Sequence, residues 1–280
     1  MGSGGALART YGALMDQLWS KDPRRRSAIA PKKFKDVLEQ ANPMFAGYDQ
    51  HDHSELVIFL LDGLHEDLNR VVGKKPYVEE VECDGRPEDE VSREAWKGYL
   101  MRNKSIMVDI FQGQLRSTLT CTTCGYARVK FDPLMYLTLE IPKSGRTDLA
   151  ACLDAFLSEE VLDGDNQVYC SKCKEHMDFT KKFDLWKMPP VLIIILKRFE
   201  FDNRTQRSTK RDTPVAFPVQ DLDFRGYVKS AEREPPIFDL FAYTNHYARH
   251  DSAEDFLSIG RSAFTAMAWI FIPAYCSAIP

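Results

Sequence analysis

Residues 114–131 read QLRSTLTCTTCGYARVKF, and residues 168–186 read VYCSKCKEHMDFTKKFDLW. Each stretch holds a Cys-x-x-Cys pair between runs with the residue types of β-strands. Zinc prefers four thiolate or imidazole ligands in a tetrahedron, and a Cys-x-x-Cys turn supplies two of them from one tight knuckle. The pairs predict one structural zinc ion at the tip of a β-ribbon, held by Cys121, Cys124, Cys170 and Cys173. The alternative is four cysteines without a metal.

The sequence around these pairs predicts more strands and one helix. The separation between Cys124 and Cys170 is wider than in a compact zinc ribbon and leaves room for a helix at 148–160 (DLAACLDAFLSEE). Residues 134–141 form another extended run. Residues 191–196 (VLIIIL) are continuously apolar, which is typical of a strand that is buried on both faces.

The first half of the chain reads as helical. Apolar residues recur at helical spacing from Ala6 to Ser20 and again in residues 54–69. In the first of these helices we expect one apolar face, made of Leu7, Tyr11, Leu14, Met15 and Leu18. Asp52 and Glu55 stand where a capping box would close the start of the second helix. The charged stretch from Lys74 to Glu94 predicts an exposed connection.

Composition excludes several classes of protein. The 280 residues are 44% apolar and 28% charged, and the net charge of −4 gives no reason to expect nucleic acid as a partner. The first residues lack the pattern of a signal peptide, so the seven cysteines favour metal or free thiols over disulfides and a cytoplasmic or nuclear location. Residues 262–280 carry no charge, but Pro273 and the lack of basic anchors argue against a membrane span.

Several separate segments, in order, give the chain a closer resemblance. These are residues 45–70 (FAGYDQHDHSELVIFLLDGLHEDLNR), 106–124 (IMVDIFQGQLRSTLTCTTC), 131–139 (FDPLMYLTL) and 169–199, which end in LKRF. Residues 245–250 (NHYARH) begin like the histidine segment of the same family. Over roughly residues 4–247 the chain resembles the ubiquitin-specific proteases, and in particular members with an insertion between the two zinc-binding pairs.

The resemblance implies an α+β fold of the papain-like thumb, palm and fingers type, incomplete at both ends, with a zinc ribbon in the fingers. We expect a helical thumb remnant at 1–115, fingers at 116–185, palm strands at 186–247 and a divergent apolar tail at 248–280. The implied partners are ubiquitin or ubiquitinated proteins. In the family, the residues that match Asp52 and Glu55 bind the ubiquitin tail, and the helix-capping role described above is the alternative.

The catalytic residues implied by the resemblance are not found at their expected places. The family uses a cysteine at a helix start, activated by a histidine that an Asp or Asn orients. Its nucleophile belongs to a GNTC-like segment upstream of the part that matches residues 4–20. By family spacing the histidine falls eight residues after His246, where this sequence has Glu254, and the segment that supplies the orienting Asp is absent. We therefore expect no catalytic residue in this chain.

The remaining cysteines and His250 are poor substitutes for those residues. Cys152 falls on the apolar face of a predicted helix, Cys83 stands among acidic residues and Cys276 belongs to the uncharged tail. Three hypotheses follow: an incomplete catalytic domain of a deubiquitinase, an inactive ubiquitin-binding or scaffold protein, and a chain that does not fold stably.

Overall fold

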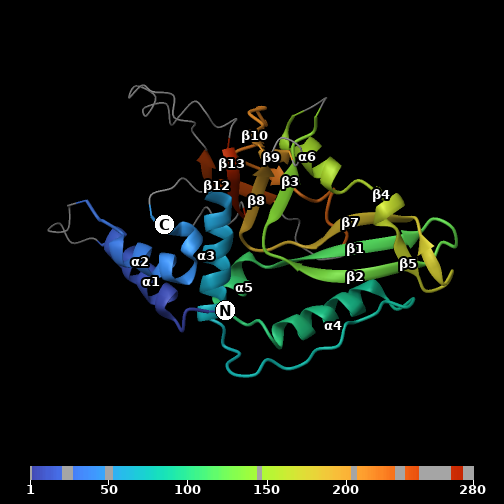
Figure 1. Ribbon diagram of the computed structural model, residues 1–280, viewed down its shortest axis with the longest axis horizontal. Helices are drawn as coiled ribbons and strands as arrows, with labels where there is room; N and C mark the ends of the chain where they lie inside the picture. The colour runs from blue at the N-terminus through green and yellow to red at the C-terminus, as the bar shows by residue number, and fades with distance from the viewer. Residues whose placement is uncertain are drawn as a thin grey trace. The chain divides into compact units, whose positions relative to one another are not determined.

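A computed structural model describes residues 2–20, 28–47, 53–143, 147–202, 207–230, 237–245 and 266–273 (Figure 1). The chain forms two compact units. The first consists of Met1–Lys75 and Asn103–Asp109, and the second of Pro76–Arg102 and Ile110–Pro280. Helix α5 (Ile106–Phe111) begins in the first unit and ends in the second.

The first unit is built from helices α1 (Ala6–Leu18), α2 (Lys32–Ala41) and α3 (His53–Asp67), with a short 3-10 turn at Pro43–Phe45. Helices α1 and α3 confirm the two predicted helices, whereas α2 was not predicted. The predicted apolar face of α1 is only partly correct, because Leu7 is buried and Leu18 is 53% exposed. Gly63 permits close packing, since a Cβ there would lie 2.5 Å from the Cδ2 of Leu7.

The carboxylate of Asp67, at the end of α3, caps the start of α1. It accepts hydrogen bonds from the backbone N–H and the hydroxyl of Ser3, at 2.6 and 2.5 Å, and from the N–H of Ala8 at 3.2 Å. The first N–H groups of a helix have no partner within the helix. A side chain distant in sequence therefore performs the role that a local N-cap residue usually performs.

The second unit contains a four-stranded antiparallel sheet with the strand order β2-β1-β7-β4 (Figure 1). Its strands are β1 (Gly113–Cys121), β2 (Ala127–Leu134), β4 (Glu160–Leu162) and β7 (Phe179–Lys187). The predicted strands on both sides of each cysteine pair are confirmed. The predicted helix at 148–160 is too long: α6 spans Leu149–Phe156, and Glu160 already pairs with Lys181 of β7.

The predicted exposed connection from Lys74 to Glu94 is wrong in its second part, because helix α4 (Glu88–Leu100) begins within it. The connection ends at Pro87, and the helix that follows packs in a cluster with the sheet. Val91 of α4 lies in this buried cluster with Phe131 and Trp186. Gln114 of β1 also donates a hydrogen bond to the carbonyl of Ser92 at 3.0 Å. The high charge of this segment hid a narrow apolar face.

A five-stranded sheet has the order β11-β12-β13-β8-β3, with β3 parallel to β8. Its strands are β3 (Leu137–Glu140), β8 (Leu192–Lys197), β11 (Leu222–Asp223), β12 (Ile237–Asn245) and β13 (Ala266–Pro273). Leu192, Ile193, Ile194, Ile195 and Leu196 are all at most 4% exposed. The prediction of a strand buried on both faces is confirmed.

Strand β13 comes from the segment that we expected to be a divergent apolar tail. It lies between β12 and β8, with Trp269 opposite Ile194 and Ala268 opposite Ile195. Part of the uncharged segment at 262–280 thus forms a central strand, for which the absence of charge is appropriate. Within the described ranges, no helix combines the length and apolarity needed to cross a bilayer.

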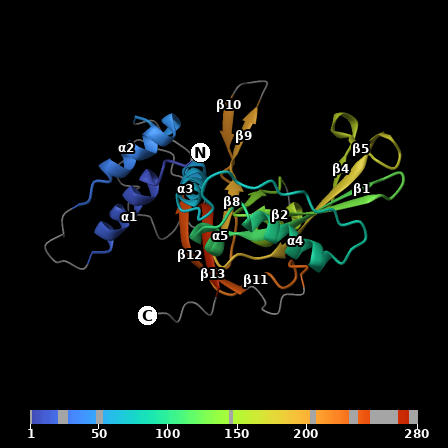
Figure 2. The same ribbon diagram turned by 90° about the horizontal axis from the view of Figure 1, so that it is seen from below.

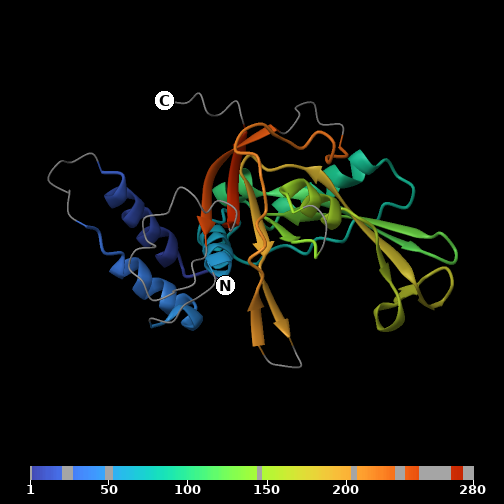
Figure 3. The same cartoon turned by 90° about the horizontal axis from the view of Figure 1, so that it is seen from above.

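Two short hairpins complete the second unit. Strands β5 (Val168–Cys170) and β6 (Glu175–Met177) carry the second cysteine pair. Strands β9 (Phe199–Asp202) and β10 (Arg207–Lys210) follow β8 and project away from the sheet (Figure 2, Figure 3).

Candidate metal centre

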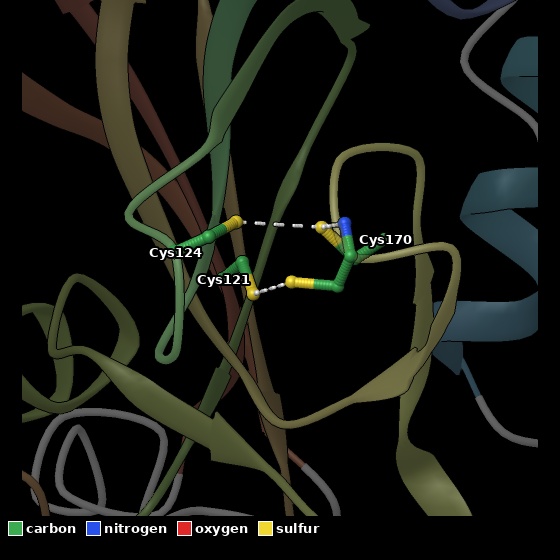
Figure 4. A group of neighbouring side chains, drawn as sticks. Cys121, Cys124 and Cys170 are labelled. Carbon is green, nitrogen blue, oxygen red and sulfur yellow. Dashed lines mark hydrogen bonds between the residues drawn. The ribbon is translucent and has the colours of Figure 1, made fainter.

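Four sulfur atoms from two separate turns meet where the strands of the ribbon end. The Sγ atoms of Cys121 and Cys173 are 4.0 Å apart, and those of Cys124 and Cys170 are 3.6 Å apart. All four lie within 4.8 Å of one another. In Figure 4, Cys121 and Cys124 lie on one side of the cluster and Cys170 lies on the other. The predicted ligand set is therefore brought together by the fold.

The first knuckle joins β1 to β2. Gly125 has a φ of 70° and donates its N–H to the carbonyl of Cys121 at 2.9 Å. Cys121 in turn donates its own N–H to the carbonyl of Tyr126 at 2.9 Å. Gly125, in the left-handed backbone conformation, reverses the chain just after the second cysteine, so both sulfurs turn toward the same point.

The second knuckle repeats this geometry between β5 and β6. Lys174 has a φ of 65° and donates its N–H to the carbonyl of Cys170 at 2.8 Å. The N–H of Cys173 points at the sulfur of Cys170, at 3.5 Å. Such N–H groups favour a thiolate at this sulfur, because they place positive partial charge beside it.

The two knuckles are tied together near the cluster. Thr122 donates both its backbone N–H and its hydroxyl to the carbonyl of Asp178, each at 3.0 Å. The side chain of Asp178 accepts a hydrogen bond from Gln167 at 2.8 Å. Residues that surround both pairs thus hold the two turns in register without relying on the sulfurs.

The spacing of the sulfurs fits a tetrahedral metal site. With a metal–sulfur bond of about 2.3 Å, a tetrahedron of four thiolates has edges of about 3.8 Å. The Cys124–Cys170 and Cys121–Cys173 separations, 3.6 and 4.0 Å, lie on either side of that value. Both far exceed the length of a disulfide bond, which is about 2.05 Å. Four protein ligands leave no position for water or substrate, so the donor set suits a structural metal.

The four cysteines differ in exposure and in acidity. Cys121 and Cys170 are at most 1% exposed and pack against Phe179, whereas Cys124 is exposed. The backbone N–H of Cys173 is the largest cause that lowers the pKa of Cys170, to about 6. The thiol of Cys124 raises the pKa of Cys173 to about 12. A metal at this centre would have to displace protons from the less acidic thiols.

The other predicted site residues that the structure describes are not ligands of this centre. Glu55 is exposed in the first turn of α3, where its charge suits the helix dipole. Asp52 falls outside the described residues, as do His246, His250, Glu254 and Cys276. The capping box and the ubiquitin-tail role of Asp52 and Glu55 stay predictions.

The structure places two of the remaining cysteines. Cys152 is fully buried on α6, as its place on an apolar helix face predicted, and burial raises the pKa of its thiol to about 11. Cys83 is half-buried against the cluster that contains Val91. Neither thiol has the exposed, electropositive surroundings of a reactive cysteine.

Sequence reasoning missed a buried polar contact on α3. The imidazole of His65 is 7% exposed, with Nδ1 at 2.7 Å from the hydroxyl of Ser105 and Nε2 at 3.3 Å from the side-chain oxygen of Asn103. The contact fixes the segment before α5 to α3 within the first unit. Its only signal was a histidine on the apolar side of a helix, which does not reveal a partner.

Comparison with known proteins assigns the chain to a family. The family described as ubiquitin carboxyl-terminal hydrolase matches residues 3–270. Ubiquitin carboxyl-terminal hydrolase 2 of Gallus gallus is 40% identical over 243 residues, which cover 86% of this chain and 66% of the relative. The Homo sapiens protein of the same name is 38% identical over 243 residues, covering 86% and 39%. The chain thus spans about two thirds of the first relative and about two fifths of the second.

Two further comparisons agree. Putative ubiquitin carboxyl-terminal hydrolase 11 of Arabidopsis thaliana is 50% identical over 144 residues, covering 51% of this chain and 16% of the relative. A solved SAGA DUB module bound to monoubiquitin aligns with a TM-score of 0.65 and 18% identity, covering 96% of this chain and 58% of that chain. The last likeness concerns the fold alone, and it confirms the predicted α+β ubiquitin-specific protease fold.

Proposed function

The chain belongs to the ubiquitin carboxyl-terminal hydrolase family, and from that membership we propose that it is part of the catalytic domain of a deubiquitinase. The reaction is thiol-dependent hydrolysis of the isopeptide bond at the C-terminus of ubiquitin. The family match over residues 3–270 is the observation that carries this proposal. Ubiquitin and ubiquitinated proteins are the proposed partners, and the cytoplasm or nucleus the proposed location.

We propose zinc as the metal of the four-cysteine centre. Four thiolates with these separations match the ligand preference of zinc better than that of magnesium or calcium, which take oxygen ligands. The metal supplies no catalytic chemistry at a closed site. It stabilises the ends of β1 and β7 and the β5–β6 hairpin, which carry the residues that would contact a protein substrate in the fingers. Our division into thumb, fingers, palm and tail segments remains a proposal.

We further propose that this chain alone does not carry the nucleophile. Support comes from the described cysteines, because four share the metal centre and Cys152 is buried with a raised pKa. A catalytic thiol needs access and a lowered pKa. The remaining described cysteine, Cys83, is half-buried and lies against an apolar cluster.

A second candidate function is an inactive ubiquitin-binding or scaffold protein. The four-cysteine centre favours it, because a set of metal ligands with no reactive cysteine among the described residues would preserve a binding surface rather than a reaction. Both candidates predict that this chain binds ubiquitin without forming an adduct, and they differ in whether the complete catalytic domain, with its nucleophile, reacts covalently.

Ubiquitin with a thiol-reactive C-terminal group tests these candidates in the zinc-loaded full chain. We expect no covalent adduct and measurable reversible binding of unmodified ubiquitin. An adduct on any cysteine, mapped by peptide mass spectrometry, would overturn the absence of a nucleophile. Absence of ubiquitin binding by a folded, zinc-loaded chain would count against both candidate functions. A close relative with its full catalytic domain is the positive control for the probe.

A further inference from the structure

A cavity lies within the second unit at the carboxyl ends of the two parallel strands β3 and β8. Its volume is about 370 Å³. The wall comes from the last residues of both strands and the turn after β3, from α6 and from the segment after β10. The lining residues that matter for its charge are Glu140, Lys143, Lys197 and Arg211.

Among the described residues, three cations and one carboxylate line this cavity, so this part of the lining has an excess of two positive charges. Lys197 and Glu140 are opposite each other in the parallel register and form an ion pair at 3.0 Å. The Glu140 side chain is 76% exposed and that of Lys197 is 54% exposed, so solvent screens this pair and its net contribution to stability is small. Lys143 is also exposed.

The third cation, Arg211, is held in place by the backbone around the cavity. Its Nη1 donates to the carbonyl of Ile141, at the end of β3. Its backbone N–H donates to the carbonyl of Arg198 at 2.6 Å. Arg198 is 1% exposed and donates in turn to the carbonyls of Arg211 and Thr213, at 3.0 and 2.8 Å. The guanidinium of Arg211 is thus fixed before any ligand arrives.

We propose that this cavity binds the phosphate group of a phosphate monoester, an activity separate from the proposed deubiquitinase function. A phosphate monoester carries a charge of about −1.5 to −2 at pH 7, which matches the excess positive charge of the cavity. A fixed guanidinium combined with mobile ammonium groups is a common arrangement for phosphate oxygens. The cavity volume exceeds that of phosphate itself, so the organic part of the ester has room beside Phe199 and Ala155.

In this arrangement Glu140 competes with the ligand. Its carboxylate occupies Lys197 in the absence of phosphate and repels an anion that enters the cavity. Binding of the phosphate transfers Lys197 from Glu140 to a phosphate oxygen, with no covalent change. A variant without this charge should therefore bind phosphate more tightly than the natural chain, which loss of folding cannot mimic.

The test is a calorimetric titration of the zinc-loaded full chain with inorganic phosphate and with N-acetyl-O-phosphoserine amide, at constant ionic strength. The first pair of variants is Glu140→Gln and Lys143→Gln. We expect the first to tighten and the second to weaken binding, each about three-fold, as for single exposed charges. Glu79→Gln and Lys104→Gln make the same changes at exposed positions outside the cavity and should leave affinity unchanged.

If the ester binds more tightly than inorganic phosphate, the site recognises a phosphorylated molecule. If the two bind equally, the site recognises the phosphate group alone. Both results support the site. The proposal is overturned if chloride at the same ionic strength reproduces the heat of binding, or if the Glu140→Gln and Glu79→Gln variants bind phosphate equally. It also fails if wild-type protein shows no saturable binding of either compound.

Discussion

Gly125 and Lys174 occupy the same position in the two cysteine knuckles. Each follows the second cysteine of its pair, each has a positive φ, of 70° and 65°, and each donates its N–H to the carbonyl of the first cysteine. One position is filled by the residue that adopts this conformation freely and the other by a residue that does so at a cost. The second knuckle therefore carries backbone strain that the first does not.

Replacing Lys174 with glycine should stabilise the zinc-loaded chain. The left-handed conformation costs about 1–2 kcal/mol for most residues, and glycine loses about 0.5–1 kcal/mol more through conformational entropy. We expect a net gain of about 0.5–1 kcal/mol in the free energy of unfolding, measured in denaturant with zinc in excess.

The matched control is Gly125→Ala. An added Cβ there meets no atom within 4 Å, so any loss of stability comes from backbone conformation alone. We expect a loss of about 1 kcal/mol. A Lys174→Gly variant less stable than wild type would contradict the assignment of strain to that residue.

Removing the metal should loosen the ribbon tip and leave the helices of the first unit in place. We expect one zinc per chain by elemental analysis, none in Cys121→Ser, and an unchanged content in Cys83→Ser, which lies outside the cluster. Metal binding must displace thiol protons, such as that of Cys173, whose pKa is raised to about 12. Zinc affinity should weaken as the pH is lowered, by about tenfold per pH unit for each proton that binding releases. Zinc bound equally well by Cys121→Ser would exclude this centre.

The strands and the metal ligands could be predicted because their signal is local. A Cys-x-x-Cys turn specifies its own geometry, and the continuous apolar run at 191–196 is enough to predict a buried strand. The meeting of the two pairs was also predicted, because a tetrahedral zinc site needs four ligands and each pair supplies two. The positive φ of Gly125 has a sequence signal, whereas that of Lys174 has none.

The elements that were missed depend on distant partners. Helix α4 is held by Val91 under Phe131 and Trp186 and by the pairing of Glu88 with Arg116, none of which is visible in a charged window of sequence. Strand β13 forms by pairing with β12 and β8, which lie elsewhere in the sequence. In an isolated segment, its lack of charge indicates burial but does not distinguish a central strand from a tail.

Arg116 should be essential for the packing of α4 on the sheet. It donates to both carboxylate oxygens of Glu88, at 2.9 and 2.6 Å, and to Asp184 at 2.7 Å. Asp184 is 5% exposed, so Arg116→Leu would leave a buried carboxylate whose remaining ion pair, among the described residues, is with Lys182 at 3.6 Å. We expect a loss of about 3 kcal/mol in the free energy of unfolding.

Two further variants separate the cost of leaving the buried Asp184 carboxylate unpaired from the loss of attraction between Arg116 and Glu88. Glu88→Gln should cost less than about 1 kcal/mol, because its carboxylate is partly solvated. The double variant Arg116→Leu with Asp184→Leu should recover most of the loss, since no buried charge is left unpaired. Equal destabilisation by Arg116→Leu and Glu88→Gln would show that the desolvated carboxylate of Asp184 is not the main cost.

The capping of α1 by Asp67 should depend on pH. Partial burial opposes the shift, but hydrogen bonds from Ser3, Ala8 and Gly5 lower the pKa of this carboxyl. A lowered pKa in the folded state gives stability that is present above the unfolded pKa, about 3.9, and lost as pH falls through the folded pKa. Asp67→Asn should lower the free energy of unfolding at neutral pH, because a neutral amide oxygen accepts these hydrogen bonds less strongly than a carboxylate, and the loss should shrink in acid. A constant difference between the two proteins across that range would rule out a role for the charge.

The cysteines should react with iodoacetamide in an order set by their surroundings. Cys152 is fully buried and its thiol has a pKa of about 11, so it should remain unmodified in the native zinc-loaded chain and react only on unfolding. The four cluster cysteines should be protected by zinc and become reactive after chelation, the exposed Cys124 first. Cys83 is half-buried, so we expect it to react both with and without zinc, but more slowly than an exposed thiol. Peptide mass spectrometry after timed labelling measures all of these rates. Rapid native labelling of Cys152 would show that α6 opens readily, and would restore that thiol as a candidate nucleophile.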